Sequence, residues 1–262
     1  MSDIQLGSSH FWKPFYRLGY THSFFNLDAE IILHTWFMMV FLFTMIAIIR
    51  FFLHQKNSLI RFLSIQYVGQ LKDLCSQTIG NFQANHFYFI SSIFTFILFC
   101  NMISLIPWIE EPTKSPSTTF ALSLISFFYI QWFTIATHGL GSYIKEYFSP
   151  FFIFFPLNII GKLSSVVSMA FRLFGNIFGG ATISSIFFGV VRALLPVTSF
   201  KLSSSIMFLL YFTTTNIINL GLLLFFGIFE GFIQALVFTM LTLTYLSSAI
   251  YVNSSKERKS LS

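Results

Sequence analysis

One arginine in an otherwise apolar stretch is the residue of this sequence with the clearest chemical use. Arg172 lies within residues 169–180, where most of the side chains suit the hydrocarbon of a membrane. A central cation costs about 2.5–3.5 kcal/mol on membrane-insertion scales, so it is expected where its charge has a use. The guanidinium stays protonated at any realistic pH. It therefore cannot relay protons by titrating, but it can attract and hold a carboxylate.

Two polar stripes extend this pattern along the C-terminal half. Spacings of three and four residues place side chains on one face of a helix. The first stripe consists of Asn158, Lys162, Ser165, Ser168, Arg172, Asn176 and Gly179. The second consists of Asn216, Asn219, Leu223, Gly227, Glu230, Gln234 and Tyr245. Small residues also mark plain contacts between membrane helices, and this explanation stays open for Gly161, Gly175 and Gly179.

Glu230 is the only acid between residues 151 and 252, and its relation to Arg172 has two possible forms. A tight ion pair between the two would neutralise both charges. A carboxylate at some distance, in a water-filled cleft, would instead be able to take up and release protons. The sequence leaves both arrangements open.

The elements that must position these residues are membrane helices. The chain has 262 residues, of which 55% are hydrophobic and 9% charged, whereas a soluble domain carries about 25% charged residues. Several apolar runs approach the ~20 residues that cross a bilayer. We therefore expect one all-α polytopic membrane domain with about five crossings, in contact with lipid and not with nucleic acid.

The expected elements follow the hydropathy along the chain. The last two apolar runs would each be about 60 Å long as a helix, roughly twice the ~30 Å hydrocarbon core, so we expect two long, tilted, antiparallel helices. The expected parts are an external segment at 1–28, spans at 30–52, 87–109 and 118–137, a surface helix within 53–86, long helices at 150–195 and 203–248, and an internal tail at 253–262.

Several motifs together resemble subunit a of the membrane sector of F-type ATP synthases. They are the run Arg172-Leu-Phe-Gly-Asn176 after a serine-rich segment, and residues 233–246 with Gln234. Supporting fragments lie at 26–28, 101–107 and 156–160, so the resemblance covers about residues 22–252. It implies an integral protein of a bacterial plasma membrane, with the mitochondrial inner membrane as the alternative.

The resemblance also implies a mechanism and a set of partners. Arg172 would face a carboxylate of a rotor ring of small hairpin subunits, between two offset half-channels for protons. The implied proton path comprises Glu230, Gln234, Asn176, Ser168, Asn216 and Asn219. Peripheral-stalk subunits and, indirectly, a soluble ATPase head would complete the complex. ATP chemistry would lie on those other subunits, so we expect no enzyme activity, cofactor or metal in the isolated chain.

The sequence departs from the family pattern at its usual relay groups. The family usually carries an acid or histidine nine residues after the arginine and seven before the glutamine, and here these positions are Ala181 and Gly227. Gly161 and Lys162 replace two acids, and Ser104 stands where an aspartate is common. Either Glu230 takes over the relay with water, or proton access is altered.

Two other classes of function compete with this interpretation. A secondary transporter or channel would use Arg172 to bind an anionic substrate, but we find no inverted repeat to support it. A purely structural subunit of a membrane complex has no need of a central cation, so Arg172 and Gln234 argue against it.

The distribution of basic residues predicts the orientation of the chain. Lysine and arginine concentrate in residues 53–86 and 256–259, whereas Glu110 and Glu111 follow the second span. The positive-inside rule then places the N-terminus outside and the C-terminus inside, with an odd number of crossings. Tags on the two ends, probed by protease or label access on sealed vesicles, should respond on opposite faces. Both tags on one face would contradict the crossing number.

Overall fold

The all-α architecture is confirmed by a computed structural model, which describes residues 11–12, 27–54, 59–80, 83–105, 111–148, 151–194 and 204–260. Within these ranges the regular structure is helical, apart from a two-residue antiparallel pairing of β1 (Phe11–Trp12) with β2 (Leu27–Asp28). Five helices there are long and apolar enough to cross a membrane. Most of the expected external segment lies outside the described residues.

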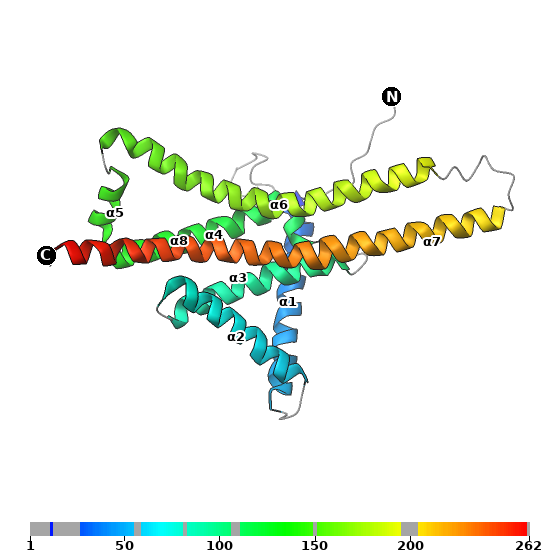
Figure 1. Ribbon diagram of the computed structural model, residues 1–262, viewed down its shortest axis with the longest axis horizontal. Coiled ribbons are helices and arrows are strands. Elements are labelled where there is room, and N and C mark those ends of the chain that lie inside the picture. The colour runs from blue at the N-terminus through cyan, green and yellow to red at the C-terminus, as the bar shows by residue number, and fades with distance from the viewer. Residues whose placement is uncertain are drawn as a thin grey trace.

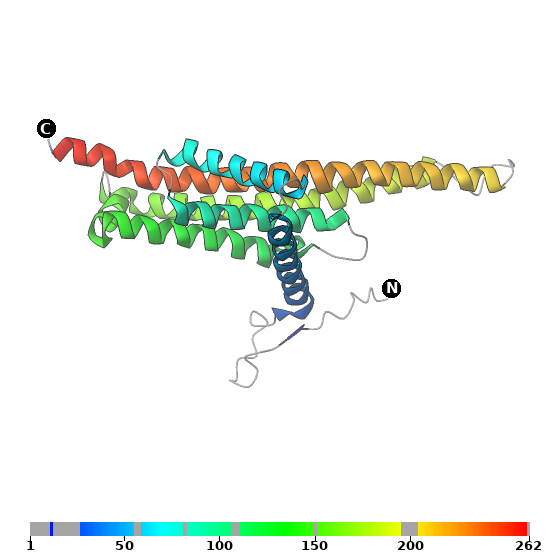
Figure 2. The same cartoon turned by 90° about the horizontal axis from the view of Figure 1, so that it is seen from below.

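The first half of the chain forms the scaffold behind the long helices. The first span, α1 (Ala29–Phe52), runs at a steep angle to the long C-terminal helices in both views (Figures 1 and 2). The next helix, α2 (Leu59–Ile79), packs against α3 and α8 and buries Leu71, Cys75 and Ile79. The remaining elements of this half are α3 (Ala84–Met102), η3 (Ile103–Leu105), η4 (Pro112–Lys114), α4 (Pro116–His138) and α5 (Leu140–Tyr147).

Two long antiparallel rods form the second half (Figure 1). The first is the short η5 (Phe152–Phe154) followed by α6 (Phe155–Leu194), which has 40 residues. The second is α7 (Ser204–Leu223), the π-helix η6 (Leu224–Glu230) and α8 (Gly231–Ser260), joined without a break. At ~1.5 Å per residue α6 alone is about 60 Å long, so it must lie obliquely in a ~30 Å core.

Proline placement explains why these rods are continuous. Pro156 stands in the first turn of α6, where a residue without an N–H group removes no intrahelical hydrogen bond. Pro116 has the same position in α4. The interiors of the described helices contain no proline, so none of these helices is interrupted by one.

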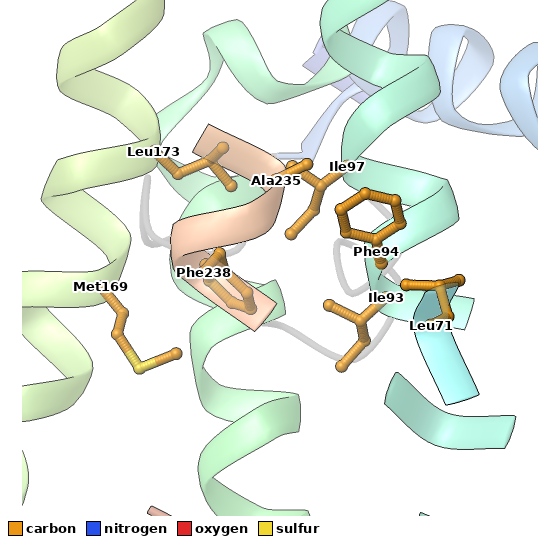
Figure 3. Packing of buried hydrophobic residues seen from close by; sticks show 8 residues of the cluster. All are labelled: Leu71, Ile93, Phe94, Ile97, Met169, Leu173, Ala235 and Phe238. Atoms are coloured by element: carbon orange, nitrogen blue, oxygen red, sulfur yellow. The ribbon is translucent and has the colours of Figure 1, made fainter. Parts of the chain in front are cut away.

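One buried cluster holds the rods to the scaffold (Figure 3). It draws side chains from α2, α3, α6 and α8, and its largest fully buried side chain is Phe238, which is 1% exposed. Its members are Leu71, Ile93, Phe94, Ile97, Met169, Leu173, Ala235 and Phe238. The cluster therefore fixes how far α6 and α8 are displaced along one another.

A close backbone approach fixes α8 against α3. The side-chain amide nitrogen of Asn101 donates a hydrogen bond to the carbonyl oxygen of Gly231 at 3.0 Å. A Cβ at position 231 would lie 2.9 Å from the Cβ of Asn101, closer than side chains tolerate. Glycine is therefore required at the first residue of α8.

Removal of the central phenyl group should loosen this assembly. We expect Phe238→Ala to destabilise the solubilised chain by about 3–5 kcal/mol, since a buried phenylalanine leaves a cavity when truncated. Thermal unfolding in detergent measures the change. Phe128→Ala in α4 is the matched control, because that ring is 63% exposed and should matter little. Equal losses in the two variants would contradict the packing described.

Candidate functional site

Arg172 is displayed by the chain and not enclosed by it. It lies at the midpoint of the apolar span Phe152–Val191 and its side chain is exposed. Two apolar side chains of the same helix, Phe171 and Phe178, are 56% and 59% exposed. In the part of the chain that the structure describes, Arg172 makes no hydrogen bond or ion pair. This face of α6 therefore carries an uncompensated charge among apolar side chains.

Gln234 lies at the same depth on the opposite rod. The residue after Arg172 is Leu173, and the residue after Gln234 is Ala235. Leu173 and Ala235 both belong to the buried cluster shown in Figure 3. Gln234 is 7% exposed, and its side-chain nitrogen is buried without a hydrogen-bond partner among the described residues. A buried donor left unsatisfied costs about 1–3 kcal/mol. Arg172 and Gln234 thus lie at one level, and the described residues supply no acceptor for the guanidinium of the one or the amide nitrogen of the other.

Glu230 is the residue for which the sequence left two arrangements open. It ends η6 and is half-buried. Among the described residues neither Glu230 nor Arg172 forms an ion pair, so the structure favours separated charges over a tight pair. Glu230 is one turn from Gly227 on one side and one turn from Gln234 on the other.

The π-helix interrupts the stripe expected on the second rod. Wider π turns are rare and often occur at functional sites. Asn216 and Asn219 before it are exposed, whereas Gly227 within it and Gln234 after it are buried. The sequence pattern assumed a regular α-helix throughout, and the wide turn rotates the two halves of the stripe relative to one another.

A cleft of about 370 Å³ lies beside η4, between α3, α6, α7 and η6. We call it the η4 cleft. Ala181 and Gly227, the positions without relay groups, both line it. Its polar lining residues are Asn101, Glu111, Lys114, Asn176, Ser184 and Asn219. The cleft therefore carries polar side chains in a mainly apolar wall, although the expected relay pair is missing.

A second cleft of about 420 Å³ lies where α4 ends, between α4, α6 and α8. We call it the α4 cleft. His138, whose Nε2 donates to the carbonyl oxygen of Ala249 at 2.6 Å, lines it together with Lys162. The Nζ of Lys162 lies 4.1 Å from the ring centroid of Tyr147, a cation–π distance. The other polar lining residues are Gln131, Thr134, Ser165, Tyr245 and Ser248.

The two clefts lie on opposite sides of the Arg172 level. Along α6, residues 161–169 line the α4 cleft and residues 174–184 line the η4 cleft. Along the second rod the corresponding stretches are 245–249 and 219–227. Arg172 and Gln234 fall between these stretches and line neither cleft. The arrangement is two polar recesses separated by one fixed cation.

The predicted site residues are only partly brought together. Asn176 and Asn219 meet in the η4 cleft, whereas Ser168 is exposed and lines neither cleft. The amide nitrogen of Asn216 donates to the carbonyl oxygen of Phe212 at 2.7 Å, a bond within its own helix. Sequence reasoning missed Glu111, Lys114 and His138 as lining residues. For Glu111 the sequence does hold a usable signal, because this residue belongs to the acidic pair after the second span.

Comparison with known proteins adds a family to this geometry. A sequence profile described as ATP synthase A chain matches residues 32–247. "ATP synthase subunit a" of Desulforamulus reducens is 33% identical over 60% of this chain and 54% of its own length. The protein of the same name from Moorella thermoacetica is 34% identical over 68% of this chain and 71% of its own length.

A third relative, "ATP synthase subunit a 1" of Chlorobium luteolum, is 35% identical over 62% of this chain and 61% of its own length. The matches thus span between about half and seven-tenths of these relatives. The bacterial relatives and the five apolar helices support a multi-pass protein of a bacterial membrane, as the sequence led us to expect. The profile match covers most of the chain, and the chain belongs to the ATP synthase A chain family.

Proposed function

We propose that this chain is the proton-translocating stator subunit of a rotary ATP synthase. The observation that carries the proposal is the placement of two clefts, each with several polar side chains in its wall, on opposite sides of the Arg172 level. Each cleft serves as an aqueous half-channel that opens to one face of the membrane. A proton that crosses must leave one cleft, ride on a partner carboxylate past Arg172, and depart through the other.

Arg172 supplies the electrostatic partner for that carboxylate. An exposed guanidinium within an apolar span needs a counter-charge, and the described residues provide none in contact with it. The surrounding surface is apolar and exposed on both rods, which suits a rotor ring of small hairpin subunits. It includes Phe171, Phe178, Ile183, Ile186, Leu220, Leu224 and Phe225.

A fixed charge also prevents protons from leaking directly from one cleft to the other. Arginine does not deprotonate in proteins, so it cannot hand a proton from one cleft to the other. It favours the ionised form of the ring carboxylate when that group passes between the clefts. Gln234 orients the carboxylate by donating a hydrogen bond from its unsatisfied amide nitrogen.

The remaining polar residues hold water or transfer protons. The amides of Asn176 and Asn219 order water in the η4 cleft, and Ser168 and Asn216 do so on the exposed faces of the rods. Glu230 transfers protons between the η4 cleft and the ring, because it lies one turn beyond the lining residue Gly227. Peripheral-stalk subunits hold the chain in place, and the soluble ATPase head carries out the ATP chemistry.

The arginine provides the primary test. We expect Arg172→Lys and Arg172→Ala to abolish proton-coupled ATP synthesis while the complex still assembles. Lysine keeps a charge but can lose its proton and lacks the planar fork of the guanidinium. Proton pumping and ATP synthesis in membrane vesicles measure the effect. Arg50→Lys is the matched control, because Arg50 is exposed in the last turn of α1. Near-normal pumping by Arg172→Lys would overturn the proposed function.

Glu230 provides a separate test of the proton path. Glu230→Gln keeps the shape and hydrogen bonding of the side chain but removes its titration. We expect a large drop in proton flux with intact assembly, because proton transfer needs a group that can change charge. Flux is measured in vesicles over a range of pH on either side of neutrality. Unchanged flux throughout would show that water alone carries protons past this point, and Glu230 would then leave the proton path.

A further inference from the structure

We propose that Glu111 is the titratable group of the η4 cleft, and that protons reach the Arg172 level from this side through its carboxylate. The inference rests on the proposed function, which needs proton access through this cleft. It names a residue outside the two long rods, contributed by the loop between the second and third spans.

The first argument is that the loop holds Glu111 in place. Glu111 directly precedes η4, and its carbonyl oxygen accepts a hydrogen bond from the Lys114 backbone nitrogen at 3.1 Å. Pro112 and Thr113 are buried, and η4 packs against α1, α3, α4 and α6. A loop wedged between four helices in this way presents Glu111 to the cleft from a defined position.

The second argument is the chemistry of the cleft wall. Opposite Glu111, the rods contribute asparagine and serine side chains, which can hold water but cannot change charge. Ala181 and Gly227 contribute no polar side chain at all. Among the described lining residues, Glu111 is therefore the one carboxylate, and proton exchange near neutral pH falls to it.

The groups near Glu111 determine whether its carboxylate can take up a proton again after each transfer. Lys114, on the same loop, also lines the cleft, and a lysine side chain near a carboxylate favours the ionised form of that carboxylate. The thiol of Cys100, buried in α3, is the other titratable group that interacts with Glu111. The lining residues of α6, α7 and η6 include none. After each transfer the carboxylate thus returns to the form that accepts a proton.

The step itself is a simple proton exchange. A carboxylate oxygen of Glu111 accepts a proton from hydronium at the loop side of the cleft and releases it to water ordered by Asn176 and Asn219. No bond between heavy atoms changes. Glu230, which does not line the η4 cleft, follows in series one turn beyond Gly227.

The direct test is proton flux through the assembled complex in vesicles. We expect Glu111→Gln to lower the flux roughly tenfold or more, the scale of a lost general acid–base group. The double variant Glu111→Gln with Ala181→Glu should recover flux, because position 181 lines the same cleft. Asp73→Asn is the matched control, since it removes one exposed carboxylate in α2, outside the cleft.

A second measurement separates titration from a structural role. Glu111→His replaces the carboxyl with a group whose ordinary pKa is about 6.5 in place of about 4.3. The decline of flux with rising pH on the loop side should therefore move upward by about two pH units. This variant retains a titrating side chain, so it also decides the question if Glu111→Gln fails to assemble.

The outcomes distinguish this inference from the proposed function. Native flux in Glu111→Gln, an unshifted pH profile in Glu111→His, or no recovery in the double variant would overturn the role of Glu111. If Arg172→Lys still abolishes flux in that case, the proposed function stands and only the access route is wrong. If Arg172→Lys pumps normally, the proposed function itself is wrong.

Discussion

The structure depends on one positive charge that can neither be neutralised by titration nor satisfied within the described chain. Transfer of an ion out of water costs several kcal/mol even after the protein relaxes. Arg172 nevertheless lies at the middle of an apolar span, on a face that no other described element covers. On the adjacent faces of the same helix, Met169 and Leu173 are fully enclosed by the scaffold. The fold thus uses its core to present the charge, and the cost of that charge is to be offset by a partner.

The scaffold determines where the charge of Arg172 and the two clefts lie. A buried cluster and the contact of Asn101 with Gly231 hold the two rods at a set displacement. That displacement brings Arg172 and Gln234 to one level and leaves polar recesses above and below it. The recesses are lined by amides, hydroxyls and a few charged groups. Water can therefore approach the charge from both sides. The described side chains do not form a continuous polar path between the two clefts.

Much of this fold could be predicted from the sequence, because the length and hydropathy of a run decide whether it crosses a bilayer. Arg172 and Gln234 stand out for a related reason, since polar residues within such runs are rare. The π-helix was not predictable, because the periodicity of side chains assumes regular α turns. Nor was the position of Glu111 in the η4 cleft predictable: a charged loop residue has the same sequence pattern whether it faces bulk water or lines a cleft. The contact between Asn101 and Gly231 joins residues separated by 130 positions, and only the folded chain reveals it.

The short stretch of α6 between the clefts has an electrical consequence. The last lining residue of the α4 cleft is Met169 and the first of the η4 cleft is Phe174. These residues are separated by about 7.5 Å along the helix axis, at ~1.5 Å per residue. When water fills both clefts, the voltage across the membrane falls mainly over this stretch and not over the full ~30 Å core. Because the clefts are much closer together than the two faces of the core, the field at Arg172 is then stronger than the field of an unbroken bilayer.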